Sequence, residues 1–338
     1  MKNLFWTSLV IIIIFLGNAC HKNAETIYGN WTRKSDMDGV ARSSAASFTI
    51  DKFGYLGFGY DGRNYLTDFW KYNTDSNFWT QVSSPSDTIY HLHAVGRSGA
   101  VGFSIGTNGY VGSGYDGNNF LKDFYKYNSI TNNWEIIQSL PIERSGALSF
   151  SLNNIGYVGT GFNGTYLKDF YTLDPNTDTW TTLPGYGGSK RRNAVSFIVN
   201  NKAYIVTGVD NGSWVLDLWR FDPATKTWAG GLDAKLRDIS NVVNSNYKIV
   251  RSDAVGFSSA TKGYVALGGT NSILSDVWEY DPATDLWSMK NGFEGSPRTD
   301  AVAFSINGRM FVTTGKSGGS QLDDTWEFKP NDAYDPNN

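Results

Sequence analysis

The sequence predicts an all-β protein that folds as a six-bladed β-propeller with four strands in each blade. Three observations predict this fold: the composition, six copies of one residue pattern, and an N-terminal tryptophan that replaces one missing from the last copy. Glycine occurs 37 times in 338 residues and aromatic side chains make up 15%, whereas charged residues make up 18%. This composition disfavours helices and is typical of short strands joined by tight turns.

The repeated pattern begins at an arginine and keeps its early spacing in every copy. Alanine follows after three residues, phenylalanine after six and an aromatic residue after thirteen, and a glycine stands four residues beyond that aromatic residue. The six copies begin at Arg42, Arg97, Arg144, Arg191, Arg251 and Arg298. A repeat of 47 to 60 residues is typical of propeller blades.

The second half of each copy is marked by an aspartate that is followed, two residues later, by Trp or Tyr. These aspartates are Asp68, Asp123, Asp169, Asp217, Asp276 and Asp324. A Trp stands eleven residues after the aspartate in the first five copies. Because the aspartate occurs in all six copies, we expect it to hydrogen-bond within turns or between blades rather than to catalyse a reaction.

Each copy therefore predicts four strands in chain order. In the first copy these strands lie around Ala45, at Tyr55, through Trp70 and at Trp79. We expect the Ala, Phe, Tyr and Trp columns to form the core, because stacked sheets need matching side chains at matching heights. Turn pairs such as Asn108-Gly109 separate the strands.

The N-terminal strand is expected to close the ring. The sixth copy ends before its Trp, but Trp31 lies eleven residues before Arg42, the spacing that separates Trp287 from Arg298. A strand at residue 31 would complete the last blade and remove the open edges of the sheets. The predicted propeller spans residues 31–330, followed by a polar tail at 331–338.

With these motifs the chain resembles six-bladed kelch propellers, which belong with galactose oxidase to one superfamily. The run Tyr280 to Trp287 and the Tyr followed four residues later by Gly carry the resemblance, which covers residues 31–328. Kelch units usually have two adjacent glycines after the second strand. Here the first glycine is replaced by Phe58, Ser113, Thr160, Thr207, Leu267 and Thr314.

The first thirty residues predict export and a lipid anchor. Residues 1–19 contain a short positive start and an apolar run from Leu4 to Leu16, which is too short to cross a bilayer as a helix and is typical of a signal peptide. Small residues before the lone Cys20 resemble a bacterial lipobox, so we expect acylation of Cys20, a polar tether at 20–30, and a location in the bacterial cell envelope. An ordinary signal peptide with a nearby cysteine is the alternative.

Two sets of side chains are candidates for ligand binding at one mouth of the propeller channel. The arginines that begin the copies all precede the innermost strand, so they should crowd this mouth, where either structural pairing or ligand binding would offset their mutual repulsion. Asp253 and Asp300, two residues after their arginines, could neutralise them. The loops after the second strands add aromatic residues, which either contact a ligand or pack on adjacent loops: Tyr60, Tyr115, Phe162 and Trp214.

Two blade junctions are longer than the rest. Trp79 to Arg97 takes 18 residues and Trp228 to Arg251 takes 23, so these insertions could form two walls of a groove over the mouth. The second insertion, Gly231 to Val250, contains Lys235 to Asp238, and we expect this insertion to hold a short helical turn.

The leading hypothesis is a propeller that binds a glycan or an envelope protein at this mouth without doing chemistry. A net charge of -3 gives no basis for binding nucleic acid. We expect no cofactor and no metal; the propeller lacks the Cys of a galactose-oxidase copper site, and His91 and His93 have no evident further ligands. The resemblance extends to kelch substrate adaptors and to sialic acid mutarotases, in which arginines near this mouth bind carboxylates. It implies an alternative, a mutarotase for an acidic sugar in which Glu143 shuttles protons; a purely structural scaffold also remains open.

Overall fold

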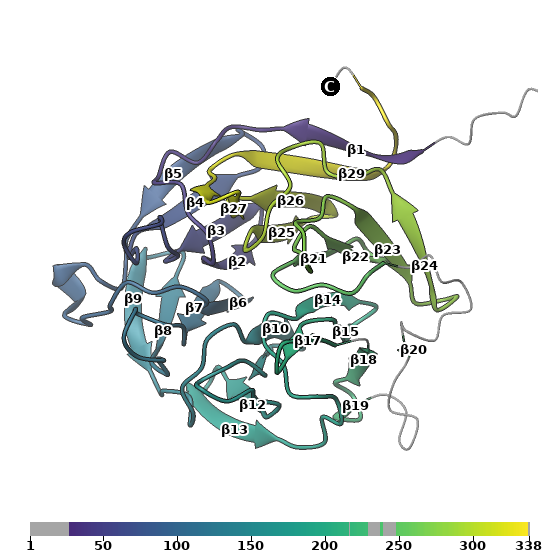
Figure 1. Cartoon of the computed structure of the whole chain (residues 1–338). Helices are drawn as coiled ribbons and strands as arrows, with labels where there is room; N and C mark the ends of the chain where they lie inside the picture. The colour runs from purple at the N-terminus through teal and green to yellow at the C-terminus, as the bar shows by residue number, and fades with distance from the viewer. Residues whose placement is uncertain (1–26, 216, 229–236, 239–247, 337–338) are drawn as a thin grey trace, which may run out of the picture.

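The computed structural model describes residues 27–336 except residue 216 and the segments 229–236 and 239–247, and these residues form a ring of six four-stranded antiparallel sheets (Figure 1). The predicted all-β, six-bladed fold is confirmed. The signal peptide, Cys20 and most of the tether lie outside the described residues. In the part of the chain that is described, no helix is long and apolar enough to cross a bilayer.

The blades follow one another around the ring, each with its first strand at the centre, and we number them 1 to 6 in chain order. Blades 1 and 2 consist of β2 (Ala46–Ile50), β3 (Phe53–Gly57), β4 (Phe69–Asn73) and β5 (Phe78–Val82), then β6 (Val101–Ile105), β7 (Asn108–Gly112), β8 (Phe124–Asn128) and β9 (Asn133–Ile137). Blades 3 and 4 consist of β10 (Leu148–Leu152), β11 (Ile155–Gly159), β12 (Phe170–Asp174) and β13 (Thr179–Leu183), then β14 (Val195–Val199), β15 (Lys202–Val206), β18 (Asp217–Asp222) and β19 (Thr227–Trp228). Blades 5 and 6 consist of β21 (Val255–Ser258), β22 (Gly263–Ala266), β23 (Val277–Asp281) and β24 (Leu286–Lys290), then β25 (Val302–Ile306), β26 (Arg309–Thr313), β29 (Thr325–Ala333) and β1 (Tyr28–Arg33).

The core lies between the blades, where the repeated aromatic residues stack. Phe48 faces Tyr55 in the register of β2 and β3, and their rings stack at 4.9 Å. The same Phe and Tyr pair recurs as stacked rings in blades 2 to 5. Trp79 of blade 1 is buried against Phe304 of blade 6. The repeat thus places large side chains at equal heights in the successive sheets.

The alanine column differs from the prediction, because it is only partly buried. Its six members encircle the central channel, where they border both the cavity at the mouth and the channel below it: Ala45, Ala100, Ala147, Ala194, Ala254 and Ala301. A small side chain is required at this position because six inner strands converge there.

The N-terminal strand closes the ring as predicted. In Figure 1 β1, in purple, lies beside the yellow β29, with which it pairs in antiparallel register. Trp31 faces Phe328 in that register, is fully buried, and contacts the rings of Phe293 and Phe328 at 4.7 and 4.6 Å. The closing strand therefore supplies the missing tryptophan of blade 6.

The first insertion does not form a wall over the mouth. It contains a short 3₁₀ helix, η1 (Thr88–Tyr90), and the hydroxyl of Tyr90 donates to the carbonyl of Asn132. Asn132 lies in the turn between β8 and β9, at the end of blade 2 away from the mouth, so the insertion follows the outer rim.

The second insertion lies mostly outside the described residues. The short helical turn expected within Gly231 to Val250 falls mostly outside the described residues, and the described Arg237 and Asp238 form the strand β20 (Arg237–Asp238). β19 is described as Thr227–Trp228, which pair with Phe221 and Asp222, and β20 pairs with Asp217 and Leu218 at the start of β18.

Candidate functional site

Each arginine that begins a copy is buried beside the aspartate of the same copy. All six arginine side chains are 0% exposed, and both terminal guanidinium nitrogens contact the carboxylate at 2.5 to 3.0 Å. The pairs are Arg42–Asp68, Arg97–Asp123, Arg144–Asp169, Arg191–Asp217, Arg251–Asp276 and Arg298–Asp324. Of the two roles that the sequence left open, structural pairing is the one observed.

The aspartate also explains why Trp or Tyr follows two residues later. The indole of Trp70 donates to Asp68 at 2.6 Å, and the hydroxyl of Tyr125 donates to Asp123 at 2.6 Å. Burial raises the pKa of Asp123, but the hydrogen bonds and charge of Arg97 outweigh that effect and hold the pKa below its ordinary value. The carboxylate therefore stays ionised and fixes three segments of its blade.

The same arginines stabilise a strained turn. One terminal nitrogen of each donates to the carbonyl of the residue that replaces the first kelch glycine, as Arg97 does to Ser113. These six residues adopt left-handed φ values of 58 to 63°, a region that glycine occupies without penalty. The backbone geometry of the glycine is kept although the residue has changed.

The mouth of the channel is formed by a closed ring of backbone hydrogen bonds. Two residues after each arginine the backbone is left-handed, and its N–H donates to the carbonyl at the same position in the neighbouring blade, at 2.8 to 3.3 Å. The six positions are Ser44, Gly99, Gly146, Asn193, Asp253 and Asp300. This ring fixes their side chains around one opening.

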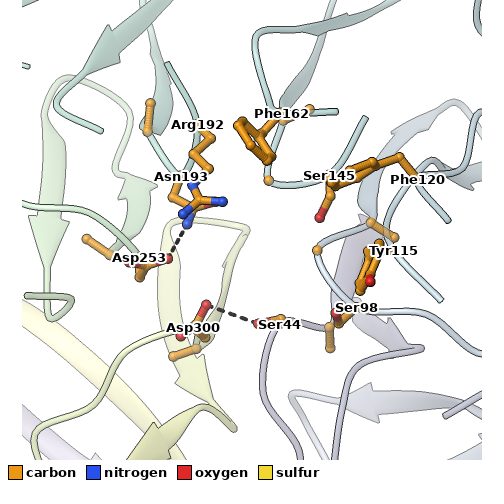
Figure 2. A pocket seen from close by; sticks show the side chains of 18 residues that line it. Ser44, Ser98, Tyr115, Phe120, Ser145, Phe162, Arg192, Asn193, Asp253 and Asp300 are labelled. Carbon is orange, nitrogen blue, oxygen red and sulfur yellow. Dashed lines mark hydrogen bonds between the residues drawn. The ribbon is translucent and has the colours of Figure 1, made fainter. Parts of the chain in front are cut away.

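A cavity of about 420 Å³ lies at this opening, and we call it the mouth cavity. It is open to solvent and continues at the alanine column into a central channel lined by the inner strands. Figure 2 shows that its two sides differ in chemistry: Asp253 and Asp300 lie on one side, and Tyr115, Phe120 and Phe162 lie on the other. The arginines of the Arg–Asp pairs are not among the residues that line it.

The acidic side consists of Asp253 and Asp300, which we call the acidic pair. Asn193 and Ser252 donate to the carboxylate of Asp253, while Ser44 donates to Asp300 and Lys316 forms an ion pair with it at 3.1 Å. Neither carboxylate forms an ion pair with Arg251 or Arg298, so the expectation that they neutralise these arginines is wrong: Asp276 and Asp324 already occupy them. Burial and the neighbouring Asp300 carboxylate raise the pKa of Asp253 to about 6.

The aromatic side is part of a longer series of ring contacts, which we call the aromatic arc. It joins the loops of blades 1, 2 and 3 through successive centroid distances of 4.9 to 6.2 Å. Its members are Tyr60, Tyr65, Tyr115, Phe120, Phe162 and Tyr166. The loop aromatics therefore pack on adjacent loops, and three of them also line the cavity. The glycines of the backbone ring, Gly99 and Gly146, also line the cavity.

The structure separates the predicted site residues into two groups. Tyr115 and Phe162 line the mouth cavity, whereas Tyr60 does not; it contacts Tyr65, which in turn contacts Tyr115. Trp214 is half-buried in the hairpin of β16 (Val209–Asp210) and β17 (Ser213–Trp214), and it does not line the cavity. Glu143 is also absent from its lining.

Sequence reasoning did not identify Arg192 and Asn193, which line the cavity. The repeat pattern itself marks position 192 as unusual. The residue after each arginine is Ser or Thr in five copies and Arg in the fourth, so Arg192 is the exception in its column.

Two family models match the chain. The KLHDC2/KLHL20/DRC7 Kelch-repeats domain matches residues 30–192, which hold most of β1 and the first three blades, and the Kelch motif matches residues 265–291 in blade 5. No curated protein is significantly similar to the chain. The two matches lie on blades that repeat one pattern around a closed six-bladed ring, and the chain is therefore a kelch-repeat β-propeller.

Proposed function

We propose that this propeller binds a carbohydrate in the mouth cavity and leaves it chemically unchanged. The observation that carries the proposal is the cavity itself, in which aromatic rings face carboxylates across one opening. A sugar ring has an apolar C–H face that packs on aromatic side chains and hydroxyl groups that hydrogen-bond to carboxylate and amide groups. A volume of about 420 Å³ lies in the range of small-molecule sites and would hold one or two sugar units.

The groups around the cavity suit such a ligand. Tyr115, Phe120 and Phe162 would contact its apolar face, and Asp253, Asp300 and Asn193 would accept or donate hydrogen bonds at its edge. Because Asp253 and Asn193 are held by the backbone ring and by each other, little side-chain freedom would be lost on binding.

We also propose that the propeller is held at the bacterial cell envelope by lipid on Cys20. This part rests on the N-terminal sequence, with its apolar run and lone cysteine. Glycans and envelope proteins are accessible there, and a protein partner that inserts a loop into the mouth cavity is the alternative ligand.

A sugar mutarotase is the second candidate, and the acidic pair is the observation that favours it. Asp253 has a raised pKa in a cavity, as a proton-transferring group requires. Under this alternative Asp253, rather than Glu143, would shuttle the proton. Anomer interconversion followed by NMR tests it directly, and an absence of acceleration across neutral and acidic sugars removes it.

Binding of a saccharide panel, measured by calorimetry on the wild-type protein and on Phe162→Ala, tests the main proposal. We expect at least one saccharide to bind and Phe162→Ala to weaken it by about 5- to 10-fold, because one aromatic contact contributes about 1 kcal/mol. The matched control is Phe78→Ala, which removes an exposed phenylalanine on the outer strand β5.

The outcomes separate the candidates. Equal losses in Phe162→Ala and Phe78→Ala would place the ligand elsewhere on the surface. Binding of envelope proteins but of no saccharide would replace the carbohydrate with a protein partner.

A further inference from the structure

Arg192 breaks the repeat at a position that faces the mouth. The residue that follows the first arginine of each copy is Ser43, Ser98, Ser145, Ser252 or Thr299 in the other five copies. The main chain at this position is the same in all six, because each residue pairs with the start of the hairpin that follows the second strand of its blade. The fold therefore accepts serine here, and the arginine must be explained by something other than the backbone.

The guanidinium of Arg192 is held in place by aromatic rings rather than by a carboxylate, as far as the described residues show. It lies over the ring of Phe162 at 4.9 Å and over that of Tyr166 at 5.7 Å, at the end of the aromatic arc. Its Nε is buried without a hydrogen-bond partner, and within the described residues its side chain forms no ion pair, although its charge counteracts part of the rise in the pKa of Asp253. By contrast, each arginine of the Arg–Asp pairs is fully buried and bonded to its aspartate.

Two further features show that this group is available to a ligand. Arg192 lines the mouth cavity together with Phe162 and Asn193, and Figure 2 shows its side chain beside Asn193 at the junction of the acidic and aromatic sides. Stacking occupies the flat face of a guanidinium and leaves the N–H donors at its edge free, which is the geometry that binds a planar carboxylate with two hydrogen bonds.

We propose that Arg192 selects ligands that carry a carboxylate, so that the carbohydrate bound in the mouth cavity is a sugar acid. This inference rests on the proposed function and adds the class of sugar to it. The carboxylate would accept hydrogen bonds from Arg192, and the sugar ring would extend from Arg192 across Phe162 toward Tyr115.

The groups around Asp253 give the proposal a pH signature. Asp300, Lys316, Arg192, Asn193 and Ser252 surround its carboxyl group, whose pKa is already raised to about 6. An anionic ligand beside Arg192 would raise that pKa further through like-charge repulsion. Binding would then take up a proton, and the affinity for a sugar acid should increase as the pH falls from 8 to 5. A cationic ligand would show the opposite trend.

The test compares sugar acids with their own neutral methyl esters. The ligands are glucuronate, galacturonate and N-acetylneuraminate, together with the methyl ester of each. A sulfated neutral sugar is tested separately. Each ligand is titrated into the wild-type protein and into Arg192→Ser, Arg192→Lys and Arg63→Ser. Serine is the residue of four other copies at position 192, so Arg192→Ser should fold. Arg63 is an exposed arginine in the loop of blade 1 at the same face and serves as the matched control for charge.

We expect the wild-type protein to prefer an acid over its ester, and Arg192→Ser to lose about 10- to 100-fold in affinity for the acid while its affinity for the ester is unchanged. The affinity of Arg192→Lys for the acid should lie between those of the wild type and Arg192→Ser, because lysine keeps the charge but not the planar guanidinium. Arg63→Ser should bind the acid as tightly as the wild type does.

Three results would overturn the inference: equal affinity for acids and esters, preference for the sulfated sugar alone, or a preference that survives in Arg192→Ser. The first would leave the proposed carbohydrate function intact. Binding of no saccharide at all, acid or neutral, would overturn both.

Discussion

At the scale of single residues, the guanidinium of each paired arginine joins otherwise separate parts of a blade. Arg97 donates to both oxygens of Asp123, to the carbonyl of Ser113 and to that of Val95. It therefore ties the segment that precedes the inner strand to the loop between the second and third strands. The ion pair is partly shielded from solvent, because Arg97 is fully buried while the Asp123 side chain is 27% exposed.

Arg97→Met should lower the free energy of unfolding by about 3 kcal/mol. Methionine fills a similar volume but leaves Asp123 and the Ser113 carbonyl without their partner, and breaking a buried pair on one side costs about that much. Urea denaturation measures the loss. Arg63→Met, at an exposed position, should change it by less than about 0.5 kcal/mol; similar values for both variants would contradict the structural role of the pair.

Ser113→Gly should raise stability by about 1 kcal/mol. Ser113 is fully buried at φ 58°, and its hydroxyl has no hydrogen-bond partner within the described structure. Glycine relieves the left-handed strain and removes the unpaired hydroxyl, which together outweigh its larger entropy loss. Ser113→Ala removes the hydroxyl but keeps the backbone strain. Thermal unfolding of the two variants therefore separates the contribution of the unpaired hydroxyl from that of the strain. A Ser113→Gly protein that melts below the wild type would refute this account.

At the scale of elements, the inner strands approach one another through small residues that differ from blade to blade. A Cβ on Gly102 of β6 would lie 2.4 Å from the carbonyl oxygen of Ser47 on β2. The same column position holds Ser149 in β10, whose hydroxyl donates to the carbonyl of Gly102 at 2.8 Å. Blades 1 and 2 are therefore closer at this height than blades 2 and 3.

Gly102→Ala should destabilise the protein by about 2 kcal/mol, because a backbone carbonyl cannot move aside as a flexible side chain can. Ser149→Ala places the same residue at the equivalent position of the next blade and should cost about 1 kcal/mol or less, the value of one hydrogen bond. Chemical denaturation of both variants gives the comparison. The packing argument fails if Ser149→Ala is the more damaging change.

The repeat explains why the elements could be predicted from the sequence and the candidate site could not. Strands and closure depend on side chains that occur in every copy, so Trp31 could be assigned to blade 6 from spacing alone. The binding surface depends on residues that depart from the repeat. Because Arg192 occurs in one copy only, the repeat does not indicate which side chains surround it. The pairing of Arg97 with Asp123 was also missed, because residues 26 positions apart meet only through the turn of a blade.

At the scale of the whole molecule, the ring is held by one non-covalent closure. Blade 6 combines three strands from the C-terminal end with β1, and no other described blade joins distant parts of the chain in this way. Trp31 lies at the centre of that closure and is in contact with Phe293 and Phe328.

Trp31→Ala should destabilise the entire propeller by about 3 to 5 kcal/mol, the cost of emptying a large buried site. Because closure couples all six blades, we expect the loss in a single cooperative transition by both circular dichroism and tryptophan fluorescence. Phe78→Ala, on an exposed position of β5, is the control. A separate early transition confined to part of the signal would show that the other blades remain folded without closure.

The dependence of stability on pH reflects two opposing sets of carboxyl groups. Burial raises the pKa values of Asp68, Asp123, Asp169 and Asp324, but the hydrogen bonds and charge of their arginines outweigh it and hold the pKa values below the ordinary range. A lowered folded-state pKa contributes stability that is present above the unfolded value, about 4, and is lost as the pH falls below it. Because four such groups belong to one cooperative unit, the stability should fall steeply as the pH drops below about 4.

Asp253 acts in the opposite direction, and its contribution can be isolated. Its folded-state pKa is raised to about 6, so its stabilising contribution is present below about pH 4 and is lost as the pH rises through about 6. The melting temperature should therefore rise steeply from pH 3 to 5 and then decline slightly to pH 7. In Asp253→Asn the decline should become smaller but not disappear, because asparagine does not titrate while Glu294 and Asp323, whose pKa values burial also raises, remain. The loss of stability at low pH should be unchanged, because the arginine pairs are untouched. Thermal scans at half-unit pH intervals measure both effects, and an undiminished decline in Asp253→Asn would assign it to other groups.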